Sequence, residues 1–266
     1  NALEGRYDLQ KELGRGGMGV VYLARDKQLD RPVALKFLGS LVDDSEEFRE
    51  RFVREARTAA KISHPNIVSI YDISASEGRA YIAMEYVEGV SLYRYLAKKG
   101  ALPPREAVNF MVQACSALAA IHEGGITHRD IKPDNVLIAK GGLVKIMDFG
   151  LAKSEDNRLT RAGVVMGTPS YMSPEQARGK EADARSDIYS IGMVLHECLT
   201  GQIVFASGNV VMRQVQEMPP PPSASKDDIP NELDAIVMKC IQKKPEDRYQ
   251  SMHELVADLR ALNLGA

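Results

Sequence analysis

The sequence is short of cysteine, of net charge and of long apolar runs, and each shortage excludes a class of protein. Its 266 residues include three cysteines, Cys115, Cys198 and Cys240, which are far apart and odd in number. These residues do not form a disulfide framework, and they lack the spacing of a metal–thiolate site. Their apolar helical surroundings indicate buried, reduced thiols.

The charges nearly balance, with a net charge of −2 at pH 7. Nucleic-acid binding is not expected, because contacts to many phosphates require a basic surface. No run approaches the roughly 18 uninterrupted apolar residues of a membrane span, so no membrane segment is expected in this chain. No signal peptide is recognisable and the first residue is Asn, so we expect a piece cut from a longer protein.

What is present is an ordinary globular composition, 44% hydrophobic and 26% charged. Short β-branched and aromatic runs dominate up to residue 86, whereas residues 87–266 carry longer helical periodicities. We therefore expect two domains, 1–86 and 87–266, with a cleft for a small ligand between them.

Three glycines, Gly14, Gly16 and Gly19, follow the pattern Gly-x-Gly-x-x-Gly. Glycines at this spacing let backbone amides approach a phosphate, but the pattern alone is weak. A glycine-rich hairpin turn and a dinucleotide-binding fingerprint are alternatives, and the fingerprint needs a helix directly after the glycines. Residues 20–24 read Val-Val-Tyr-Leu-Ala and favour a continuing strand, so a hairpin folded over a nucleotide fits better.

Lys36 lies inside an apolar run at residues 33–38 that predicts a strand. A lysine in such a run usually marks a sheet edge or reaches water, and a buried one needs a partner. Glu55 shares the apolar face of a helix expected from residue 45 to about residue 63, so we expect it to pair with Lys36. The alternative is a local pair between Glu55 and Arg51.

The stretch 128–135 reads His-Arg-Asp-Ile-Lys-Pro-Asp-Asn and gathers the side-chain types that phosphoryl transfer needs. Asp130 can accept a proton from an attacking hydroxyl, Lys132 can offset phosphate charge, and Asn135 can bind Mg²⁺. Asp148, at the end of a predicted strand, is a further candidate metal ligand. The alternatives are a polar surface loop for residues 128–135 and an Asx-type turn at Asp148.

Helical periodicity is clear in the second half of the chain. One helix of about 19 residues is expected to end at Gly124, and an almost wholly apolar helix follows Asp187. Two more are expected at about 231–242 and 251–262. Residues 151–170 are polar and aperiodic, which indicates a long functional loop.

In their order along the chain, these motifs resemble those of the Hanks-type, eukaryotic-like protein kinases over residues 7–262. The segment 84–89 (Met-Glu-Tyr-Val-Glu-Gly) and the segment 167–176 (Gly-Thr-Pro-Ser-Tyr-Met-Ser-Pro-Glu-Gln) are similar to the bacterial serine/threonine branch. The resemblance implies an α+β, bilobal protein-kinase fold. Its small lobe would hold a five-stranded antiparallel sheet and one helix, and its larger lobe would be mainly helical.

The resemblance also implies roles for individual residues. The catalytic set would be Asp130, Lys132, Lys36 and Glu55, and the metal ligands would be Asn135 and Asp148. The ATP-binding residues would be Leu13, Gly14, Gly16, Gly19, Val21, Ala34, Lys36, Met84, Glu85, Val87, Leu137 and Met147. Among these, the backbone of Glu85 and Val87 would bind adenine, and Met84 would be the gatekeeper.

Two structural ties are implied as well. Asp187 should bond the backbone of the turn at residues 128–129, and Glu175 should pair with Arg248. Tyr189 stands where many family members have tryptophan, and we expect this departure to matter only for packing.

Arg129 precedes the catalytic aspartate, and in such kinases this arginine receives a phosphate from the activation loop. This predicts Thr160 as the main autophosphorylation site. Thr168 is a second phosphorylation candidate, with the stronger expectation that it contacts Asp130 and Lys132 and shapes the substrate groove.

The implied activity is transfer of the γ-phosphate of ATP to serine and threonine hydroxyls of proteins, with Mg²⁺ or Mn²⁺ as the metal. Lys132, two residues after Asp130, is a feature of the serine/threonine kinases in this family, so specificity for tyrosine acceptors is disfavoured. The alternative is a pseudokinase scaffold, but such proteins usually lack an equivalent of Lys36, Asp130 or Asp148. A small-molecule phosphotransferase is a third alternative, and it should lack the segment 173–175.

The implied partners are protein substrates that carry serine or threonine, and a second copy of the chain that binds through the small lobe. By resemblance to bacterial relatives, we expect a cytoplasmic domain at the inner end of a single-span membrane receptor.

Overall fold

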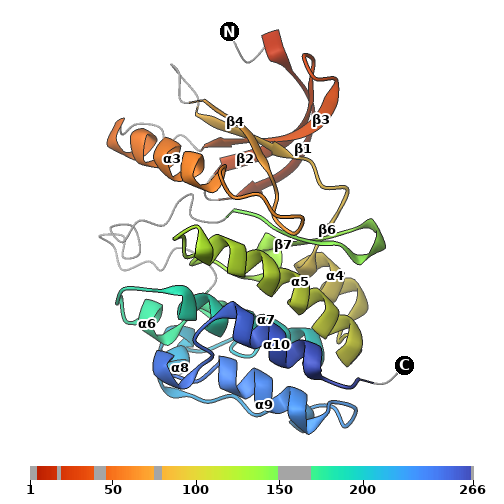
Figure 1. Cartoon of the computed structure of the whole chain (residues 1–266), viewed down its shortest axis with the longest axis vertical. Coiled ribbons are helices and arrows are strands. Elements are labelled where there is room, and N and C mark those ends of the chain that lie inside the picture. The colour runs from red at the N-terminus through yellow and green to blue at the C-terminus, as the bar shows by residue number, and fades with distance from the viewer. Residues whose placement is uncertain (1–4, 17–18, 39–45, 75–79, 149–168, 265–266) are drawn as a thin grey trace. The chain divides into compact units, whose positions relative to one another are not determined.

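The computed structural model describes residues 5–16, 19–38, 46–74, 80–148 and 169–264, without the side chains of residues 46–49 and 51–52. It divides into two compact units, one running to Glu88 and the other beginning at Gly89 (Figure 1). The boundary expected between residues 86 and 87 remains a prediction about the functional domains.

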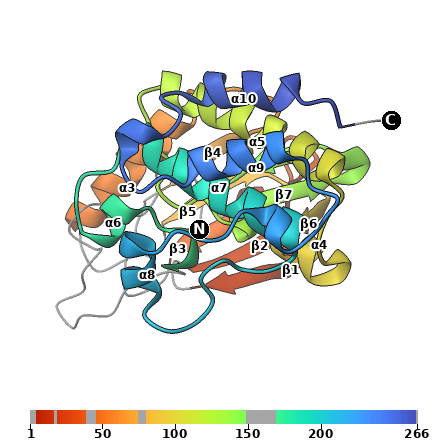
Figure 2. The ribbon, with the colours of Figure 1, turned by 90° about the horizontal axis from the view of Figure 1, so that it is seen from below.

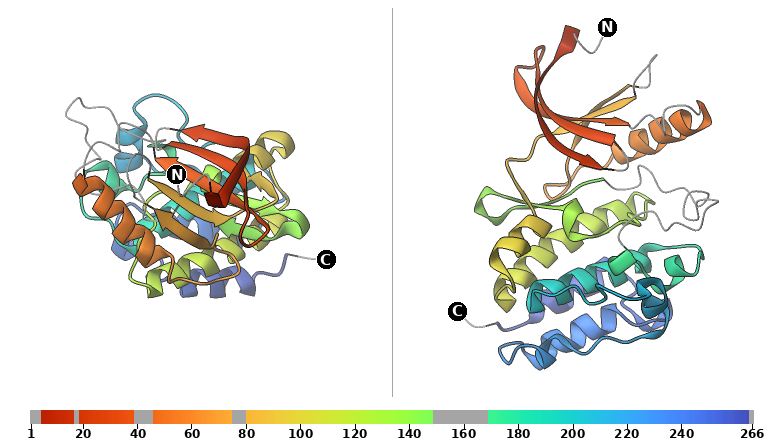
Figure 3. Two further views of the ribbon diagram at one scale, coloured as in Figure 1. Left: turned by 90° about the horizontal axis from the view of Figure 1, so that it is seen from above. Right: turned by 180° about the vertical axis from the view of Figure 1, so that it is seen from behind.

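The first unit contains a five-stranded sheet in the order β1-β2-β3-β5-β4, and every neighbouring pair of strands is antiparallel. The strands are β1 (Tyr7–Gly16), β2 (Gly19–Asp26), β3 (Arg31–Leu38), β4 (Ile70–Ser74) and β5 (Tyr81–Glu85). The helix α3 (Glu46–Ala59) contacts β4 (Figure 3). The predicted antiparallel sheet with its helix is therefore confirmed.

Alternation along β3 builds the core of this sheet. Val33, Leu35 and Phe37 are buried in one cluster with Tyr7 and Tyr81. The Tyr81 ring lies edge-on to Tyr7 at 5.8 Å between centroids and 6.1 Å from Phe37, an arrangement that aromatic rings favour. Because successive side chains of a strand point to opposite faces, the intervening residues of β3 project from the other face.

The helix α3 ends four residues before the expected position of 63. After Ala59, the amide of Lys61 bonds the carbonyl of Thr58 and the amide of Ile62 bonds the carbonyl of Ala59. These hydrogen bonds join residues three apart instead of four, so they tighten the chain into a turn. Pro65 also disfavours helical geometry in the residue before it. The apolar pattern that predicted the helix extends beyond Ala59, but the backbone leaves helical geometry there.

The second unit is mainly helical and carries a small antiparallel sheet in the order β6-β7-β8. The strands are β6 (Gly89–Ser91), β7 (Val136–Ala139) and β8 (Val144–Ile146). The helices are α4 (Leu92–Lys99), α5 (Pro104–Glu123), α6 (Pro174–Ala177), α7 (Ala184–Thr200), α8 (Val210–Gln216), α9 (Asn231–Cys240) and α10 (Met252–Ala261). The short 3₁₀ turns are Pro133–Asn135, Lys140–Gly142, Pro169–Tyr171, Pro222–Ala224 and Pro245–Asp247.

Four of these helices form the body of the unit, with α5 packed on α7 and α10, and α9 packed on α7 and α10 (Figure 2). The helix α7 is buried on almost all sides, as its apolar sequence predicted. A Cβ added at Gly192 would lie 2.5 Å from Cβ of Cys240 and 2.8 Å from Cγ2 of Ile241. Glycine at this position therefore lets α7 approach α9 closely.

The expected helices that end at Gly124, follow Asp187 and lie at about 231–242 and 251–262 are all present, and the one predicted after Asp187 begins earlier, at Ala184. The strand β6 and the helices α4, α6 and α8 were not predicted. They are short, and α4 buries only Leu92 and Leu96, so too few apolar residues repeat to give a period.

The three cysteines lie in α5, α7 and α9, and all are free and buried, as expected. Burial raises the pKa of the Cys115 thiol to about 12 and raises those of Cys198 and Cys240 as well. Such thiols are poor nucleophiles because the thiolate is the reactive form. Among the described residues, no helix combines the length and the apolar character that crossing a membrane requires.

Candidate active site

The stretch 128–135 lies between α5 and β7, and its start is held by a buried carboxylate on α7. Asp187 is 1% exposed, and it accepts the backbone amides of His128 and Arg129 at 2.8 Å each. Its Oδ2 also lies 2.7 Å from Nε2 of His122 on α5. The predicted tie between Asp187 and this turn is therefore present.

His128 connects the same stretch to the end of β8. Its Nε2 lies 3.0 Å from the carbonyl of Met147, and its Nδ1 accepts the backbone amide of Asp130 at 3.2 Å. This pair of partners requires a proton on Nε2 and none on Nδ1, which is the neutral imidazole. Burial lowers the pKa of His128 and favours the same form.

Asp130, Lys132 and Asn135 come together within this stretch. Nζ of Lys132 lies 3.5 Å from Oδ2 of Asp130, and Nδ2 of Asn135 lies 2.7 Å from the Asp130 carbonyl and 3.2 Å from its Oδ2. The side chains of Lys132 and Asp130 are 20% and 22% exposed, so the carboxylate is held on two sides and still open to a reactant. This geometry suits a group that accepts a proton from a bound hydroxyl.

The two candidate metal ligands are placed by the hairpin of β7 and β8. Val136 pairs with Ile146, and the Met147 amide donates to the Asn135 carbonyl at 3.0 Å. Asn135, just before β7, therefore lies at the same end of the hairpin as Met147, which precedes Asp148. Because Nδ2 of Asn135 faces Asp130, its Oδ1 is the atom that can bind a cation. An amide oxygen and a carboxylate are ligands that Mg²⁺ prefers, so these residues fit the expected ion.

The glycine pattern forms a hairpin in the first unit, where Gly14 pairs with Val21 and Gly16 with Gly19. The strand β2 follows the glycines directly, which decides against a dinucleotide-binding fingerprint. Gly19 has φ of +132°, which requires glycine. A Cβ added at Gly14 or Gly16 would meet nothing within 4 Å, so packing does not require glycine there. Close approach of a ligand to the backbone at these two glycines stays a prediction.

Lys36 projects from β3, where it pairs with Val21 of β2 and Ile82 of β5, and the residue is 6% exposed. Glu55 is half-buried on α3, next to the fully buried Ala56. A lysine buried to this extent in a central strand is not a sheet-edge residue. The pair between Lys36 and Glu55, and the alternative pair of Glu55 with Arg51, stay predictions.

The other expected nucleotide contacts are divided between the two units. In the first unit, Ala34 pairs with Met84 and both are buried, Leu13 is 36% exposed, and Val21, Glu85 and Val87 are half-buried. In the second unit, Leu137 on β7 and Met147 after β8 are half-buried. Their common role in holding adenine stays a prediction.

The described chain resumes at Pro169, so Thr160 and Thr168 lie outside the described residues. Past this point, Nε2 of Gln176 on α6 donates to the Arg129 carbonyl at 3.0 Å. The segment is thereby joined to the stretch that carries Asp130. No sequence pattern predicted this contact, because a glutamine near a helix start usually caps only its own helix.

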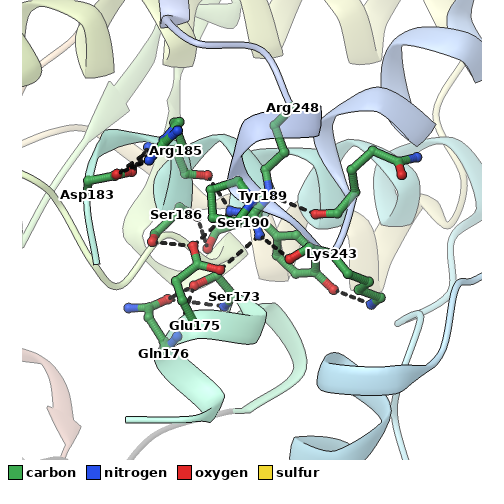
Figure 4. Close-up of polar contacts among 12 residues, drawn as sticks. Ser173, Glu175, Gln176, Asp183, Arg185, Ser186, Tyr189, Ser190, Lys243 and Arg248 are labelled. Atoms are coloured by element: carbon green, nitrogen blue, oxygen red, sulfur yellow. Dashed lines mark hydrogen bonds and ion pairs between the residues drawn. The ribbon is translucent and has the colours of Figure 1, made fainter. Parts of the chain in front are cut away.

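The predicted pair of Glu175 and Arg248 is present and buried (Figure 4). Both guanidinium terminal nitrogens lie 2.8 Å from the two Glu175 oxygens, and Oγ of Ser186 donates to the same carboxylate at 2.5 Å. Arg248 also donates to the carbonyls of Gln242, Arg185 and Lys243, so every guanidinium nitrogen is engaged. Burial alone would raise the pKa of Glu175, but its bonds to Arg248 outweigh burial and lower it.

Tyr189 does more than pack, so the expectation made for this residue is wrong. Its hydroxyl lies 2.5 Å from Oε1 of Gln214 and 2.9 Å from Nζ of Lys243. The ring lies beside the guanidinium of Arg248, at 5.0 Å from its central carbon. Gln214 and Lys243 were not singled out from the sequence, because neither belongs to a motif with a known chemistry.

Comparison with curated proteins finds several bacterial relatives, which share 41–45% sequence identity with this chain. The chain is 44% identical to "Serine/threonine-protein kinase PknB" of Mycobacterium tuberculosis over 99% of this chain and 44% of that protein. It is 42% identical to "Serine/threonine-protein kinase PrkC" of Bacillus subtilis over 97% of this chain and 40% of that protein. The chain thus spans less than half the length of these curated relatives.

Among solved structures, the crystal structure of the Mycobacterium tuberculosis PknI kinase domain matches with a TM-score of 0.78 and 29% identity. The match covers 96% of this chain and 95% of that one. The protein kinase domain profile matches residues 7–258, nearly the whole sequence. These matches agree with the expected fold class, and the chain belongs to the protein kinase domain family.

Proposed function

We propose that this chain transfers the γ-phosphate of ATP to serine or threonine hydroxyls of proteins. The observation that carries this proposal is the cluster of Asp130, Lys132 and Asn135 in a stretch whose backbone is held by Asp187. Family membership and the names of the relatives support the same activity.

In this proposal the chain's own residues orient the reactants and stabilise charge. Asp130 orients the acceptor hydroxyl and takes its proton, while Lys132 offsets the charge that develops on the transferred phosphoryl group. Asn135 and Asp148 would hold Mg²⁺ or Mn²⁺, which neutralises phosphate charge when bound. The positions of these residues in one unit support their common role.

The nucleotide would be held mainly from the first unit. Lys36, paired with Glu55, would bind the α- and β-phosphates, and the hairpin with Gly14 and Gly16 would cover the phosphates. The backbone of Glu85, the last residue of β5, and of Val87 would bond adenine, with apolar side chains on either side. Support comes from the burial of Lys36 and from the open space at the two glycines.

Replacement of the proposed base tests the reaction directly. Asp130→Asn keeps the size of the side chain but removes its ability to accept a proton, so kcat should fall by about 10²–10⁴. Asp134→Asn is the matched control, because it makes the same change at an exposed position in the same stretch. Transfer of labelled phosphate from ATP to a generic basic protein measures both. Wild-type transfer by Asp130→Asn would contradict the proposed mechanism, and ATP binding without transfer by the wild-type chain would favour a pseudokinase.

Thr160 is proposed as the main autophosphorylation site, with Thr168 as the second candidate. A phosphate adds a charge of about −2, and Arg129 is the cation expected to receive it. Phosphopeptide mass spectrometry of protein incubated with ATP and Mg²⁺ tests this. Active protein without phosphate at Thr160 would remove the assignment.

The whole protein's partners and location are also proposals. We propose protein substrates that carry serine or threonine, a homodimer through the first unit, and a position on the cytoplasmic side of a membrane receptor. The greater length of the relatives supports a longer protein with further segments. Light scattering over a concentration series tests the dimer, and a constant monomer mass at high concentration counts against it.

A further inference from the structure

Three successive carbonyls, those of residues 169–171, accept hydrogen bonds from side chains of α7 and α8. Nε2 of Gln214 donates to the Pro169 carbonyl at 3.2 Å and to the Ser170 carbonyl at 2.6 Å. Oγ of Ser190 donates to the Tyr171 carbonyl at 2.7 Å. Gln214 has no exposed surface, so its amide is committed to these contacts. The backbone of residues 169–171 is therefore set by side chains that lie far away in the sequence.

The orientation of the Gln214 amide is fixed by a directed chain of hydrogen bonds. Nζ of Lys243 lies 2.9 Å from the Tyr189 hydroxyl oxygen, and that hydroxyl lies 2.5 Å from Oε1 of Gln214 (Figure 4 shows Lys243 beside Tyr189). An ammonium can only donate, so the hydroxyl uses its single proton toward Gln214. Burial lowers the pKa of Lys243 to about 8, with Arg248 nearby acting in the same direction, so the ammonium still predominates at neutral pH. Both hydrogens of the Gln214 amide then point to the carbonyls.

A tyrosine is needed at the centre of this chain. The hydroxyl of Tyr189 accepts one hydrogen bond and donates another. A tryptophan could only donate and a phenylalanine could do neither. The buried phenol therefore has a bonding role in addition to its contact with Arg248.

The same backbone is tied to the proposed catalytic stretch. Residues 169–171 lead into α6, whose Gln176 donates to the Arg129 carbonyl at 3.0 Å, one residue before Asp130. One end of the segment is thus fixed on the catalytic stretch and the other on Gln214. A shift of either end would move the backbone that adjoins the proposed acceptor site.

We propose that Gln214, oriented by Tyr189 and Lys243, is a positioning residue that sets the backbone of residues 169–171 for binding of the protein substrate. The inference rests on the proposed kinase function. Its chemistry predicts an effect on the acceptor protein and not on the nucleotide, since these bonds hold the backbone of residues 169–171 and involve none of the proposed nucleotide-binding residues.

The test replaces Gln214 by methionine, which has a similar length and no hydrogen-bonding amide. Loss of two net hydrogen bonds predicts a rise of about tenfold in the KM for a basic acceptor protein. The KM for ATP and kcat should stay within about twofold, because no proposed nucleotide or proton-transfer contact changes. Hydrogen exchange of the amides of Ser170, Tyr171 and Met172 should become faster.

Gln113→Met is the matched control. Gln113 also bonds backbone through both ends of its amide, to the carbonyl of Gly142 at 3.0 Å and to the amide of Val144 at 3.0 Å. It belongs to the same unit, and these two bonds lie at the turn between β7 and β8 and not at residues 169–171, so the acceptor KM should not change. An equal effect of the two substitutions would show a general loss of packing and overturn the proposal.

Tyr189→Phe keeps the ring and removes the bonds to Lys243 and Gln214, so it decides the matter if Gln214→Met does not fold. It should raise the acceptor KM by about threefold, since one bond that orients Gln214 is lost. An unchanged acceptor KM in active, folded Gln214→Met or Tyr189→Phe protein overturns the inference. If the wild-type chain transfers no phosphate, the proposed function fails, and the exchange of residues 170–172 alone decides whether Gln214 fixes this backbone.

Discussion

The carboxylate of Asp187 holds Arg129 in a left-handed conformation. Its Oδ1 accepts the Arg129 amide at 2.8 Å, at a residue whose φ is +66°. A non-glycine residue in this region carries a strain of about 1–3 kcal/mol, which the surrounding bonds must offset. The buried charge of Asp187 therefore stabilises a backbone turn, and the turn places the next residue, Asp130.

Asp187→Asn should weaken both the fold and the reaction. A side-chain amide is uncharged and has one accepting oxygen where the carboxylate has two, so at least one backbone amide of the turn loses its acceptor, at a cost of about 1.5–3 kcal/mol. Urea unfolding measures this loss, and phosphate transfer should fall with it because Asp130 is less well placed. Asp227→Asn, at an exposed position, should change neither. Full stability and full transfer in Asp187→Asn would show that the turn does not depend on this carboxylate.

Two glycine substitutions should have opposite effects. Gly16→Ala meets no atom within 4 Å, so the melting temperature should hold while the KM for ATP rises through contact with the bound nucleotide. Gly192→Ala forces a Cβ against Cys240 and Ile241, which should cost about 1–3 kcal/mol of stability. Thermal unfolding and ATP titration of both variants separate the two cases. If the KM for ATP rose only in the Gly192 variant, the roles assigned to Gly16 in nucleotide contact and to Gly192 in packing would be contradicted.

Glu175 should make stability depend on acid pH. Its pKa is lowered in the folded chain from an ordinary value of 4.5, because its bonds to Arg248 outweigh burial. The contribution is therefore complete above pH 4.5 and is lost as pH falls through the lower folded value. Glu175→Gln leaves Arg248 buried without a carboxylate, which should cost about 3 kcal/mol at neutral pH.

The measurement for Glu175 is the difference in unfolding free energy between wild type and Glu175→Gln over a series of pH values. The difference should be largest near neutrality and should shrink below pH 4.5. Glu217→Gln, which removes an exposed pair with Arg213, should show a much smaller difference at all pH values. A difference that grows toward acid pH would contradict the assigned sign.

Lys36→Met tests the nucleotide side of the proposal. The long apolar side chain keeps the packing of β3, while the loss of a charge-assisted bond to phosphate should weaken ATP binding by about 10–100-fold. Lys11→Met, on the exposed part of β1, is the control. Calorimetric titration with ATP and Mg²⁺ gives both affinities. Equal affinities in the two variants would remove Lys36 from the site.

Much of the fold could be predicted because periodicity and motif order agree. The apolar run in β3 and the apolar sequence of α7 each indicated the structure that is present. The ties from Asp187 and from Arg248 were predicted from the family resemblance, and both are present. Residues with a distinct chemistry in a fixed order carry the most information about structure.

The remaining features depend on contacts that a sequence pattern does not specify. The Gln214 amide is defined by a phenol and a lysine that follow no motif, and the left-handed turn at Arg129 is set by Asp187 across the unit. Residue type alone gave Tyr189 a packing role, because a phenol and an indole fill similar space. The two side chains differ in hydrogen bonding, since a phenol can donate and accept and an indole can only donate. This difference matters only where the fold brings hydrogen-bond partners next to the side chain.

The positions of the cysteines have a practical consequence. Cys115, Cys198 and Cys240 are all buried in helices of the second unit, and residues 1–88 contain no cysteine. A maleimide reagent should therefore label the chain only when that helical unit opens, so the rate of labelling measures how often the unit opens. A single cysteine introduced on the exposed edge of β1 would react at once and could carry a fluorophore without removal of the native thiols.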